Sequence, residues 1–563
     1  MPRRGAALVP GMVASMSDTQ RKRLKSAWPV VRVMLGLGLL AGVFALPALL
    51  APDTAAPAIK LPIEALWAVV ALGLARPRAV FETIRGVVAV WALLVGVLCA
   101  ADVGVRTAFA RVFDPVRDLG LVADGWRMLS GTLGVWPAAS LLAGVLIAAL
   151  AWLCAMLWGL GGIARLGHAR TRFTLSIAGL GALCLVIAAL PGARDLAPGF
   201  RSSASGYISA RVAGIETALA DRRAFERALP RDALAGIPAD ALLSRLAGVR
   251  VMVVFVESYG RSALDDPRYQ DSTRKRLQRI EASLRAAGLS ARSGWLDSPV
   301  VGGQSWLAHA TLLSGLWVDN QNRYDRLIDS DRASLNRLFK HAGWSTVAAM
   351  PAITLAWPEA AWFGYDQVLA AADLGYRGEA FNWVTMPDQY TLSATERLTA
   401  AMPAPLMIET ALISSHAPWT PIPEMVPWEA VGDGTIFTPQ ARRGDPPEVV
   451  WRDAERVRTQ YRGAIDYSLA AVGSFMARHG DNTLFIVLGD HQPAPLITGA
   501  QASQAVPIHF VADDPELLSN LRSWPLTAGL IPGPHAPVVP MDEFRADFVR
   551  AMSAPLPEMP AND

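Results

Sequence analysis

Cysteine is nearly absent from this chain of 563 residues, which contains only three. Cys99, Cys154 and Cys184 all lie inside apolar runs, so residues 185–563 contain no thiol. That part of the chain therefore has no disulfide, no cysteine nucleophile and no thiolate zinc site. A domain without cysteine is compatible with an oxidising compartment but does not require one.

The chain also lacks a strong excess of charge of either sign, since its formal net charge is +3. A value so close to neutral argues against a nucleic-acid partner. Hydrophobic residues make up 52% of the chain, and the apolar surplus is concentrated in the first 190 residues. The rest has the mixed composition of a soluble domain. This asymmetry predicts a membrane part followed by a soluble part.

Five apolar runs are candidates for membrane spans, because a helix needs roughly 20 apolar residues to cross the hydrocarbon layer. They are Val33–Ala51, Leu61–Ala75, Gly86–Ala101, Gly134–Ile163 and Phe173–Leu190. As buried core helices of a soluble protein, five such runs so close together would be hard to cover. We therefore expect an α-helical membrane domain with five spans over residues 29–190.

Basic residues predict the orientation of these spans, because they are retained on the cytoplasmic side. Residues 1–28 contain six Lys and Arg, and segments 76–85 and 165–172 contain three Arg each. The basic N-terminus is then cytoplasmic and, after five crossings, the C-terminal domain is periplasmic or extracellular. We expect a multi-pass protein of the bacterial inner membrane. A cleaved signal peptide at the first run is the alternative; it would leave four spans and a cytoplasmic domain.

Residues 191–249 have the pattern of a helical linker. Apolar side chains alternate there with Arg222, Arg223 and Arg227, as in helices that lie on a membrane surface. A plain linker helix fits the same pattern. We expect a catalytic domain over residues 250–552 and a tail over residues 553–563.

Buried strands and helices alternate from residue 250 onward. Val251–Val256 is a continuous apolar run typical of a strand covered on both faces. Similar runs recur at Ser345–Met350, Pro405–Ile413 and Thr483–Leu488, with helix-like segments between them. This alternation predicts a doubly wound α/β domain, in which chemistry gathers at the carboxyl ends of the strands.

Polar side chains follow three of these predicted strands. Glu257 follows the first, His416 the third, and Asp490 with His491 the fourth. Glu257, Asp490 and His491 form a ligand set of two carboxylates and an imidazole, which suits Zn²⁺ or Mn²⁺. Ser305 follows Gly302 and Gly303 ahead of a helix-like segment. A coordinated hydroxyl can attack phosphorus without a separate base, and a helix start adds backbone donors. Each signal alone also fits loop capping, turn chemistry or a structural histidine.

Together these motifs resemble the sulfatase-like branch of the alkaline phosphatase superfamily. The relevant stretches are Val-Glu-Ser-Tyr at 256–259, the Gly-rich turn before Ser305, Phe-Gly-Tyr-Asp at 363–366, Ser-Ser-His-Ala-Pro at 414–418 and Leu-Gly-Asp-His at 488–491. Within this branch the chain is most similar to lipoteichoic acid synthases and to phosphoglycerol transferases of periplasmic glucans. Lipid A phosphoethanolamine transferases are more distant.

The resemblance implies an alkaline-phosphatase-like α/β domain with a mixed, mostly parallel sheet behind five spans. It also implies one divalent metal ion, Zn or Mn, with Glu257, Ser305, Asp490 and His491 as ligands. Ser305 would be the nucleophile, and His416 would bind the phosphoryl group or donate a proton. The family nucleophile is commonly Thr, and Ser preserves the chemistry.

Other positions depart from the family pattern. Trp357 is kept, but Met350 and Glu359 stand where the phosphoglycerol enzymes have His and Arg that grip the headgroup. Glu359 suits an ammonium, as in ethanolamine, or is a surface residue without a role. The disulfides typical of phosphoethanolamine transferases are absent. True sulfatases need a Cys/Ser-x-Pro-x-Arg motif, and residues 305–309 lack both the Pro and the Arg, which disfavours sulfate-ester hydrolysis.

Four residues are predicted to bind substrate, namely Trp357, Glu359, His309 and Asp388. His309 lies one helical turn beyond Ser305, and a purely structural helix residue is the alternative there. Asp388 is expected to support the site from behind the residues that touch substrate.

The expected reaction transfers a phospholipid headgroup, phosphoglycerol or phosphoethanolamine, to an envelope glycan or lipid through a covalent Ser305 intermediate. Two alternatives remain. The same site serves a phosphodiesterase, phosphatase or sulfuric-ester hydrolase that uses water as acceptor. A non-catalytic membrane sensor on a decayed hydrolase fold would instead have lost a ligand residue, and all the expected ones are present.

Overall fold

The computed structural model describes residues 18–50, 61–109, 111–115, 133–166, 171–179, 200–201, 204–499 and 501–554, with a few isolated positions between 118 and 182. The chain divides into two compact units. One comprises residues 1–104 and 112–219, and the other comprises residues 105–111 and 220–563.

The N-terminal unit is helical. Its main helices are α2 (Asp18–Leu49), α3 (Ile63–Leu74), α4 (Arg78–Phe109), α6 (Val135–Leu160) and α9 (Ala204–Ala228). The last residues of both α4 and α9 belong to the second unit. A short parallel pair joins β1 (Leu61–Pro62) to β2 (Phe200–Arg201).

Three helices in the described part of the chain are long and apolar enough to cross a membrane. These spans are Trp28–Leu49, Arg78–Phe109 and Val135–Arg165, while Glu64–Leu74 is a shorter apolar helix. They coincide with the first, third and fourth predicted spans, and α3 coincides with the second. Of the fifth predicted span, residues 173–179 are helical, and residues 180, 181 and 183–190 lie outside the described residues. The number of five spans is therefore not confirmed.

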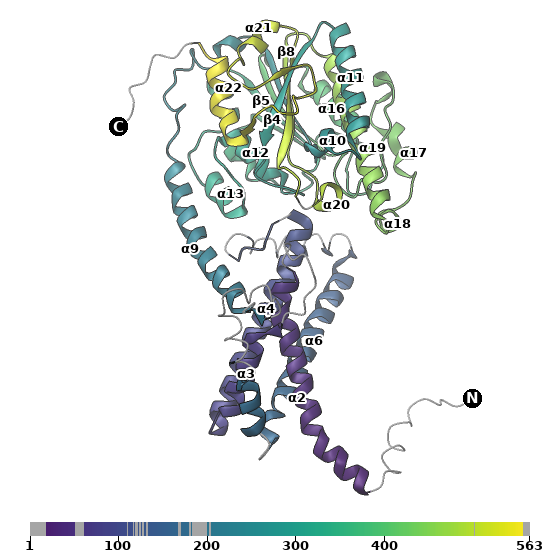
Figure 1. Ribbon diagram of the computed structural model, residues 1–563. Helices are drawn as coiled ribbons and strands as arrows, with labels where there is room; N and C mark the ends of the chain where they lie inside the picture. Colours follow the sequence, from purple (N-terminus) through teal and green to yellow (C-terminus); the bar gives the residue numbers. More distant parts are fainter. Residues whose placement is uncertain are drawn as a thin grey trace, which may run out of the picture. The chain divides into compact units, whose positions relative to one another are not determined.

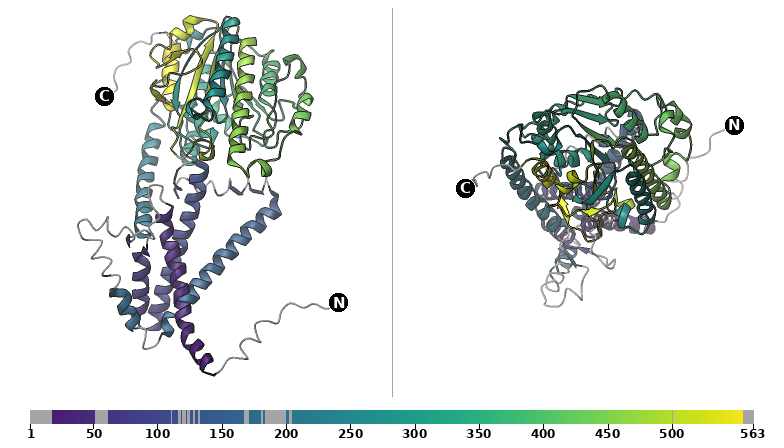
Figure 2. Two further views of the ribbon diagram at one scale, coloured as in Figure 1. Left: turned by 45° about the vertical axis from the view of Figure 1, so that its right-hand side comes forward. Right: turned by 90° about the horizontal axis from the view of Figure 1, so that it is seen from above.

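Two glycines allow α2 and α6 to pack closely. A Cβ atom on Gly159 would lie 2.6 Å from the Cα atom of Gly36, so neither position accepts a side chain without moving the helices. Small residues of this kind permit close helix contact in apolar surroundings. Figure 2 shows α6 diverging from the neighbouring helices toward its N-terminal end, and only 6% of its most apolar window is buried.

The second unit is built around a nine-stranded sheet. Its strands are β3 (Arg250–Val256), β4 (Ser290–Asp297), β5 (Ser345–Met350), β6 (Gln367–Ala370), β7 (Leu406–Leu412), β8 (Thr483–Gly489), β9 (Ala505–Ala512), β10 (Thr527–Ala528) and β11 (Val538–Pro540). The order is β10-β4-β9-β8-β3-β7-β5-β6, with β11 also paired to β4. Strands β8, β3, β7, β5 and β6 are mutually parallel, whereas β9 runs antiparallel to both β8 and β4. The sheet is therefore mixed.

Helices cover both faces of this sheet. One hydrophobic core contains residues of α11 (Gln270–Ala286), α16 (Asp388–Thr399) and α19 (Ala454–Arg478). The other contains residues of α12 (Ser305–Ser314), α13 (Gln321–Ile328), α14 (Leu335–His341), α21 (Pro515–Ser519) and α22 (Phe544–Met552). Figure 1 shows α11 and α19 side by side along one side of the sheet. Successive side chains of β3 point alternately into the two cores, as expected for a central strand.

Short helices lie in the connections of this unit. They are α10 (Ser262–Asp265), α15 (Ala360–Phe363), α17 (Thr438–Ala441), α18 (Pro447–Val450) and α20 (Pro495–Thr498), with 3₁₀ turns at Ser244–Leu246, Trp428–Ala430, Thr435–Phe437 and Met541–Glu543.

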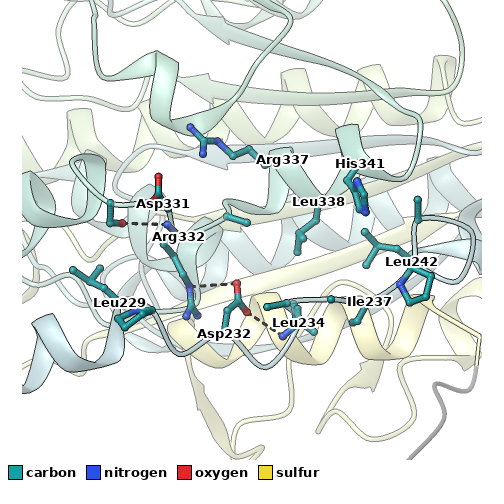
Figure 3. Close-up of a pocket in the computed structure, with 17 residues that line it drawn as sticks. Leu229, Asp232, Leu234, Ile237, Leu242, Asp331, Arg332, Arg337, Leu338 and His341 are labelled. Atoms are coloured by element: carbon teal, nitrogen blue, oxygen red, sulfur yellow. Dashed lines mark hydrogen bonds and ion pairs between the residues drawn. The ribbon is translucent and has the colours of Figure 1, made fainter. Parts of the chain in front are cut away.

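A buried ion cluster fastens the segment after α9 to this unit. Asp232 accepts hydrogen bonds from both terminal nitrogens of Arg545, at 2.9 and 2.7 Å, and pairs with Arg332 at 3.7 Å. Figure 3 shows Asp232 and Arg332 in a cavity of about 880 Å³ between residues 229–242 and 330–341. None of the predicted site residues lines this cavity, and we assign it no chemistry.

Candidate metal centre and active-site cavity

The three central strands end together. Val256 of β3 is in register with Gly489 of β8 on one side and with Leu412 of β7 on the other. The chain therefore delivers Glu257, Asp490 and His491 to one edge of the sheet. This edge is formed by the carboxyl ends of the parallel strands, where ligands bind in open α/β sheets.

These three side chains form a compact buried cluster. Each offers one oxygen or nitrogen atom, and the three atoms lie within 4.8 Å of one another. The Nε2 atom of His491 is 3.4 Å from Oε1 of Glu257 and 3.7 Å from Oδ2 of Asp490. This arrangement provides two carboxylate oxygens and one imidazole nitrogen around a single point.

Hydrogen bonds from the surrounding backbone orient the cluster. Oδ1 of Asp490 accepts from the backbone N–H groups of Ser258, at 2.8 Å, and His491, at 2.7 Å, which leaves Oδ2 turned toward Glu257 and His491. Nδ1 of His491 donates to the carbonyl oxygen of Gln492 at 2.9 Å. Since Nδ1 carries the hydrogen, Nε2 keeps its lone pair for a ligand.

The negative charges of the Glu257 and Asp490 carboxylates are not fully balanced by positively charged side chains nearby. Burial and the neighbouring Glu257 carboxylate raise the pKa of Asp490. Burial also opposes ionisation of Glu257, but His491 and His416 outweigh it and lower the pKa of that carboxyl. For His491, burial lowers the pKa and the two carboxylates raise it by more. No Lys or Arg is among the described residues that line the adjoining cavity. A site of this composition fits a divalent cation.

Ser305 is the first residue of α12 and points into this cluster. Its Oγ donates to Oε2 of Glu257 at 3.0 Å and lies 3.2 Å from Nε2 of His491. The preceding turn is fixed by a backbone hydrogen bond of 2.8 Å from the N–H group of Gly302 to the carbonyl oxygen of Gln492. Gly302 has a φ of 78°, in the left-handed region that favours glycine. The loop after β8 thus holds the start of α12 in place.

His416 approaches from the loop that follows β7. Its ring stacks on Trp383, with the ring centres 4.7 Å apart, and its Nδ1 donates to the carbonyl oxygen of Ala417 at 2.5 Å. Ser415 ties this loop to the residue that follows β3 by donating to the carbonyl oxygen of Glu257 at 2.6 Å.

Asp388 supports the same loop from behind. Its Oδ1 accepts from the backbone N–H groups of Ile413, at 2.9 Å, and Ser414, at 2.8 Å, and its Oδ2 accepts from Ser468 at 2.6 Å. The carboxyl group is fully buried, and burial raises its pKa. Asp388 lies beneath the loop and does not line the cavity.

A cavity of about 240 Å³ opens over the cluster. Of the predicted residues, its lining includes Glu257, Ser305, His309, Trp357, His416 and Asp490. Glu359 does not line it and instead precedes α15. Aromatic side chains form much of the remaining wall, including Phe255, Trp306, Phe363, Tyr365 and Trp383. Met350 also lines the cavity, at the end of β5.

One functional candidate was not predicted from the sequence. Glu409 lies within β7, is fully buried and lines this cavity together with its hydrogen-bond partners His309 and Tyr365. A carboxylate inside a mostly apolar, buried strand is the available signal, because a buried charge requires partners.

Comparison with known proteins finds one family model that matches part of this unit. Residues 250–504 match the Sulfatase family model. No curated protein matches the chain. Among solved structures, the chain is similar to the lipoteichoic acid synthase LtaP from Listeria monocytogenes, with 13% identity and a TM-score of 0.33. That match covers 47% of this chain and 65% of LtaP, just under two thirds of its length.

Two further structures are C-terminal periplasmic domains, one of them from the phosphoethanolamine transferase EptC of Campylobacter jejuni. The C-terminal periplasmic domain of EptC from Campylobacter jejuni has 10% identity and a TM-score of 0.34, covering 53% of this chain and 87% of that one. The corresponding domain of EcEptC from Escherichia coli, in complex with Zn, has 15% identity and a TM-score of 0.32, covering 47% and 72%.

Proposed function

We propose that the C-terminal domain, of which residues 250–504 match the Sulfatase family model, transfers a phospholipid headgroup to an envelope glycan or lipid through a covalent bond to Ser305. The observation that carries this proposal is the position of the Ser305 hydroxyl, 3.0 Å from Glu257 and 3.2 Å from His491. The resemblance of the motifs to phosphoglycerol and phosphoethanolamine transferases supplies the substrate class.

Glu257, Asp490 and His491 would hold one divalent metal ion, Zn or Mn, with Ser305 as a further ligand. The two carboxylates and the oriented Nε2 atom of His491 fit such an ion. When bound, it would lower the pKa of the Ser305 hydroxyl and offset negative charge on the phosphoryl group.

In the first half-reaction, Ser305 Oγ forms a bond to phosphorus and the bond from phosphorus to the glycerol oxygen of the lipid breaks. The proton lost by Ser305 ends on the released diacylglycerol. His416, whose Nδ1 is held by the carbonyl oxygen of Ala417, binds the phosphoryl group or donates that proton. Glu257 accepts the Ser305 hydrogen bond and so aims Oγ into the cavity.

In the second half-reaction, an acceptor hydroxyl takes the phosphoryl headgroup and Ser305 regains its proton. The apolar helices α2, α4 and α6 would keep the domain beside its lipid donor and let diacylglycerol stay in the bilayer. We place the domain of residues 250–552 on the periplasmic or extracellular side of a bacterial inner membrane, after a five-span domain at residues 29–190 and a linker at residues 191–249.

The test is mass spectrometry of the Ser305 peptide after the purified chain is mixed with phosphatidylglycerol or phosphatidylethanolamine. We expect the added mass of phosphoglycerol or phosphoethanolamine on Ser305. Ser305→Ala should abolish turnover while metal stays bound, and Ser283→Ala, at an exposed position of α11, serves as the matched control. Turnover near the wild-type rate in Ser305→Ala would exclude Ser305 as the nucleophile.

Product analysis separates transfer from hydrolysis. With a labelled lipid and candidate glycans, transfer places the label on the glycan. A hydrolase would release the free headgroup phosphate at the same rate with and without glycan, and that result would favour a phosphodiesterase or phosphatase.

A further inference from the structure

The cavity over Ser305 contains a second set of buried polar side chains that metal binding does not use. Glu409 lies on β7, in register with Val253 of β3, and its side chain is only 1% exposed. Its Oε1 accepts a hydrogen bond of 3.1 Å from Nδ1 of His309, one turn beyond Ser305 on α12. Both side chains line the cavity.

The other oxygen of Glu409 is also occupied. Oε2 accepts a hydrogen bond of 2.5 Å from the Tyr365 hydroxyl and one of 3.4 Å from Nδ2 of Asn336. An ionised carboxylate can only accept hydrogen bonds. The hydrogen between Glu409 and His309 therefore resides on Nδ1 of the imidazole.

The opposite edge of the His309 ring faces the cavity. The ring stacks on Phe255, with the ring centres 3.7 Å apart and the planes inclined by 13°. Within the described part of the chain, Nε2 of His309 makes no hydrogen bond, and the His309 side chain is 11% exposed. A neutral imidazole with its hydrogen on Nδ1 presents a lone pair at Nε2, so this position accepts hydrogen bonds.

We propose that Glu409 is a positioning residue that makes His309 a hydrogen-bond acceptor for a donor group on the transferred headgroup. The inference rests on the proposed function and assigns recognition of the hydroxyl or N–H group of the headgroup to His309. A trimethylammonium headgroup has no donor and would leave Nε2 unpaired inside the cavity, which is unfavourable. Glu409 is almost fully buried, and both of its oxygens are occupied by protein donors, so it acts through His309.

The substitution Glu409→Gln should reverse the polarity of His309. Tyr365 and Asn336 both donate to the position of Oε2, so the amide oxygen of Gln should face them. Its NH₂ group then faces His309 and donates to Nδ1. The ring hydrogen moves to Nε2, and His309 becomes a donor toward the cavity.

The experiment compares phosphatidylethanolamine with phosphatidylcholine as donor lipids for the full chain in detergent at pH 8, where imidazoles are usually neutral. In the wild-type chain we expect phosphatidylethanolamine to be preferred about 10-fold or more, mainly through KM, because one hydrogen bond is lost with choline. Glu409→Gln should remove this preference. Tyr365→Phe is the matched control, because it removes one hydrogen bond from the same carboxylate and leaves the hydrogen on Nδ1.

Two further measurements keep the inference testable if Glu409→Gln folds poorly or turnover is too slow. His309→Asn preserves a donor to Glu409 but has no acceptor at the position of Nε2, and should also lose the preference. Nitrogen-15 NMR of the histidine rings should show the hydrogen of His309 on Nδ1 in the wild-type chain and on Nε2 in Glu409→Gln. A preference retained in both variants, or a hydrogen that stays on Nδ1 in Glu409→Gln, would overturn the inference.

The proposed function and this inference fail in different ways. Turnover that persists in Ser305→Ala would refute the covalent mechanism. Turnover that requires Ser305 but does not respond to Glu409→Gln or His309→Asn would refute only the role of Glu409.

Discussion

His509 is a buried histidine that the structure holds in its neutral form. Its Nδ1 lies 2.8 Å from Oγ of Ser293, which itself donates to the carbonyl oxygen of Gly529 and therefore accepts from His509. Its Nε2 lies 3.2 Å from the Tyr259 hydroxyl, which can donate to it. Both ring nitrogens are thus satisfied without a charge, and burial lowers the pKa of His509 to about 3.

This histidine should make stability depend on pH. The unfolded chain binds a proton at His509 below a pKa of about 6.5, whereas the folded chain does not until about pH 3. The contribution of neutral His509 to the free energy of unfolding is therefore complete above about pH 6.5 and is lost as the pH falls toward 3. Between pH 7 and pH 5 the free energy of unfolding should fall by about 2 kcal/mol on this account.

Denaturant unfolding of wild-type and His509→Gln chains at these two pH values measures the effect. The variant should be less stable at pH 7 but should depend less on pH, by about the same 2 kcal/mol. His535→Gln, at an exposed position, should match the wild-type pH dependence. An unchanged pH dependence in His509→Gln would contradict the neutral assignment.

At the scale of helices and strands, the central strands could be predicted from the sequence. The apolar runs at Val251–Val256, Ser345–Met350 and Thr483–Leu488 match β3, β5 and β8 within a residue, because these strands are buried on both faces. Strands β4 and β9 were not predicted. β4 carries Arg292 and Gly294, and β9 contains Pro507, which counts against a central strand.

Site residues that directly follow the buried central strands could likewise be predicted, whereas those that depend on loop packing could not. Glu257, His416, Asp490 and His491 follow central strands, so their convergence follows from parallel pairing alone. The contact between Glu409 and Tyr365 depends on how the loop after α15 packs, which no local pattern reveals. For Asp388 a supporting position was predicted but its hydrogen-bond partners were not, because Ser414 and Ser468 lie on separate elements.

The contact between α2 and α6 gives a prediction at this scale. Gly159→Leu would place a side chain against the backbone of Gly36, so the helices must separate, and overpacking of this kind costs about 1–3 kcal/mol. We expect a lower thermal midpoint in detergent. Gly144→Leu, on the same helix and with no atom within 4 Å of its added Cβ, is the control and should leave the midpoint unchanged. Equal midpoints in the two variants would argue against this helix contact.

At the scale of the whole molecule, the predicted five crossings would place the N-terminus and the C-terminal domain on opposite sides of the membrane. The three long apolar helices and the shorter α3 account for four of the five predicted spans. With four crossings the C-terminal domain would lie on the same side as the N-terminus, so the side on which it lies distinguishes five crossings from four.

Labelling of introduced cysteines by an impermeant maleimide tests this orientation. In intact spheroplasts we expect labelling of Ser283→Cys, on an exposed position of the catalytic domain. Arg78→Cys, between the second and third predicted spans and with its side chain 93% exposed, should react only after lysis. The native cysteines all lie within apolar runs, so their background should be low. The reverse pattern would place the catalytic domain in the cytoplasm.

The metal content of the purified full chain tests the proposed metal centre directly, and the measurement requires no substrate. We predict one equivalent of Zn or Mn per chain in the wild-type protein and in Glu409→Gln, whose side chain lies outside the cluster of Glu257, Asp490 and His491. Asp490→Ala should lose the metal, because it removes one of the three ligands that the cluster provides. A full equivalent of metal in Asp490→Ala, or none in the wild-type chain after incubation with either ion, would contradict the proposed centre.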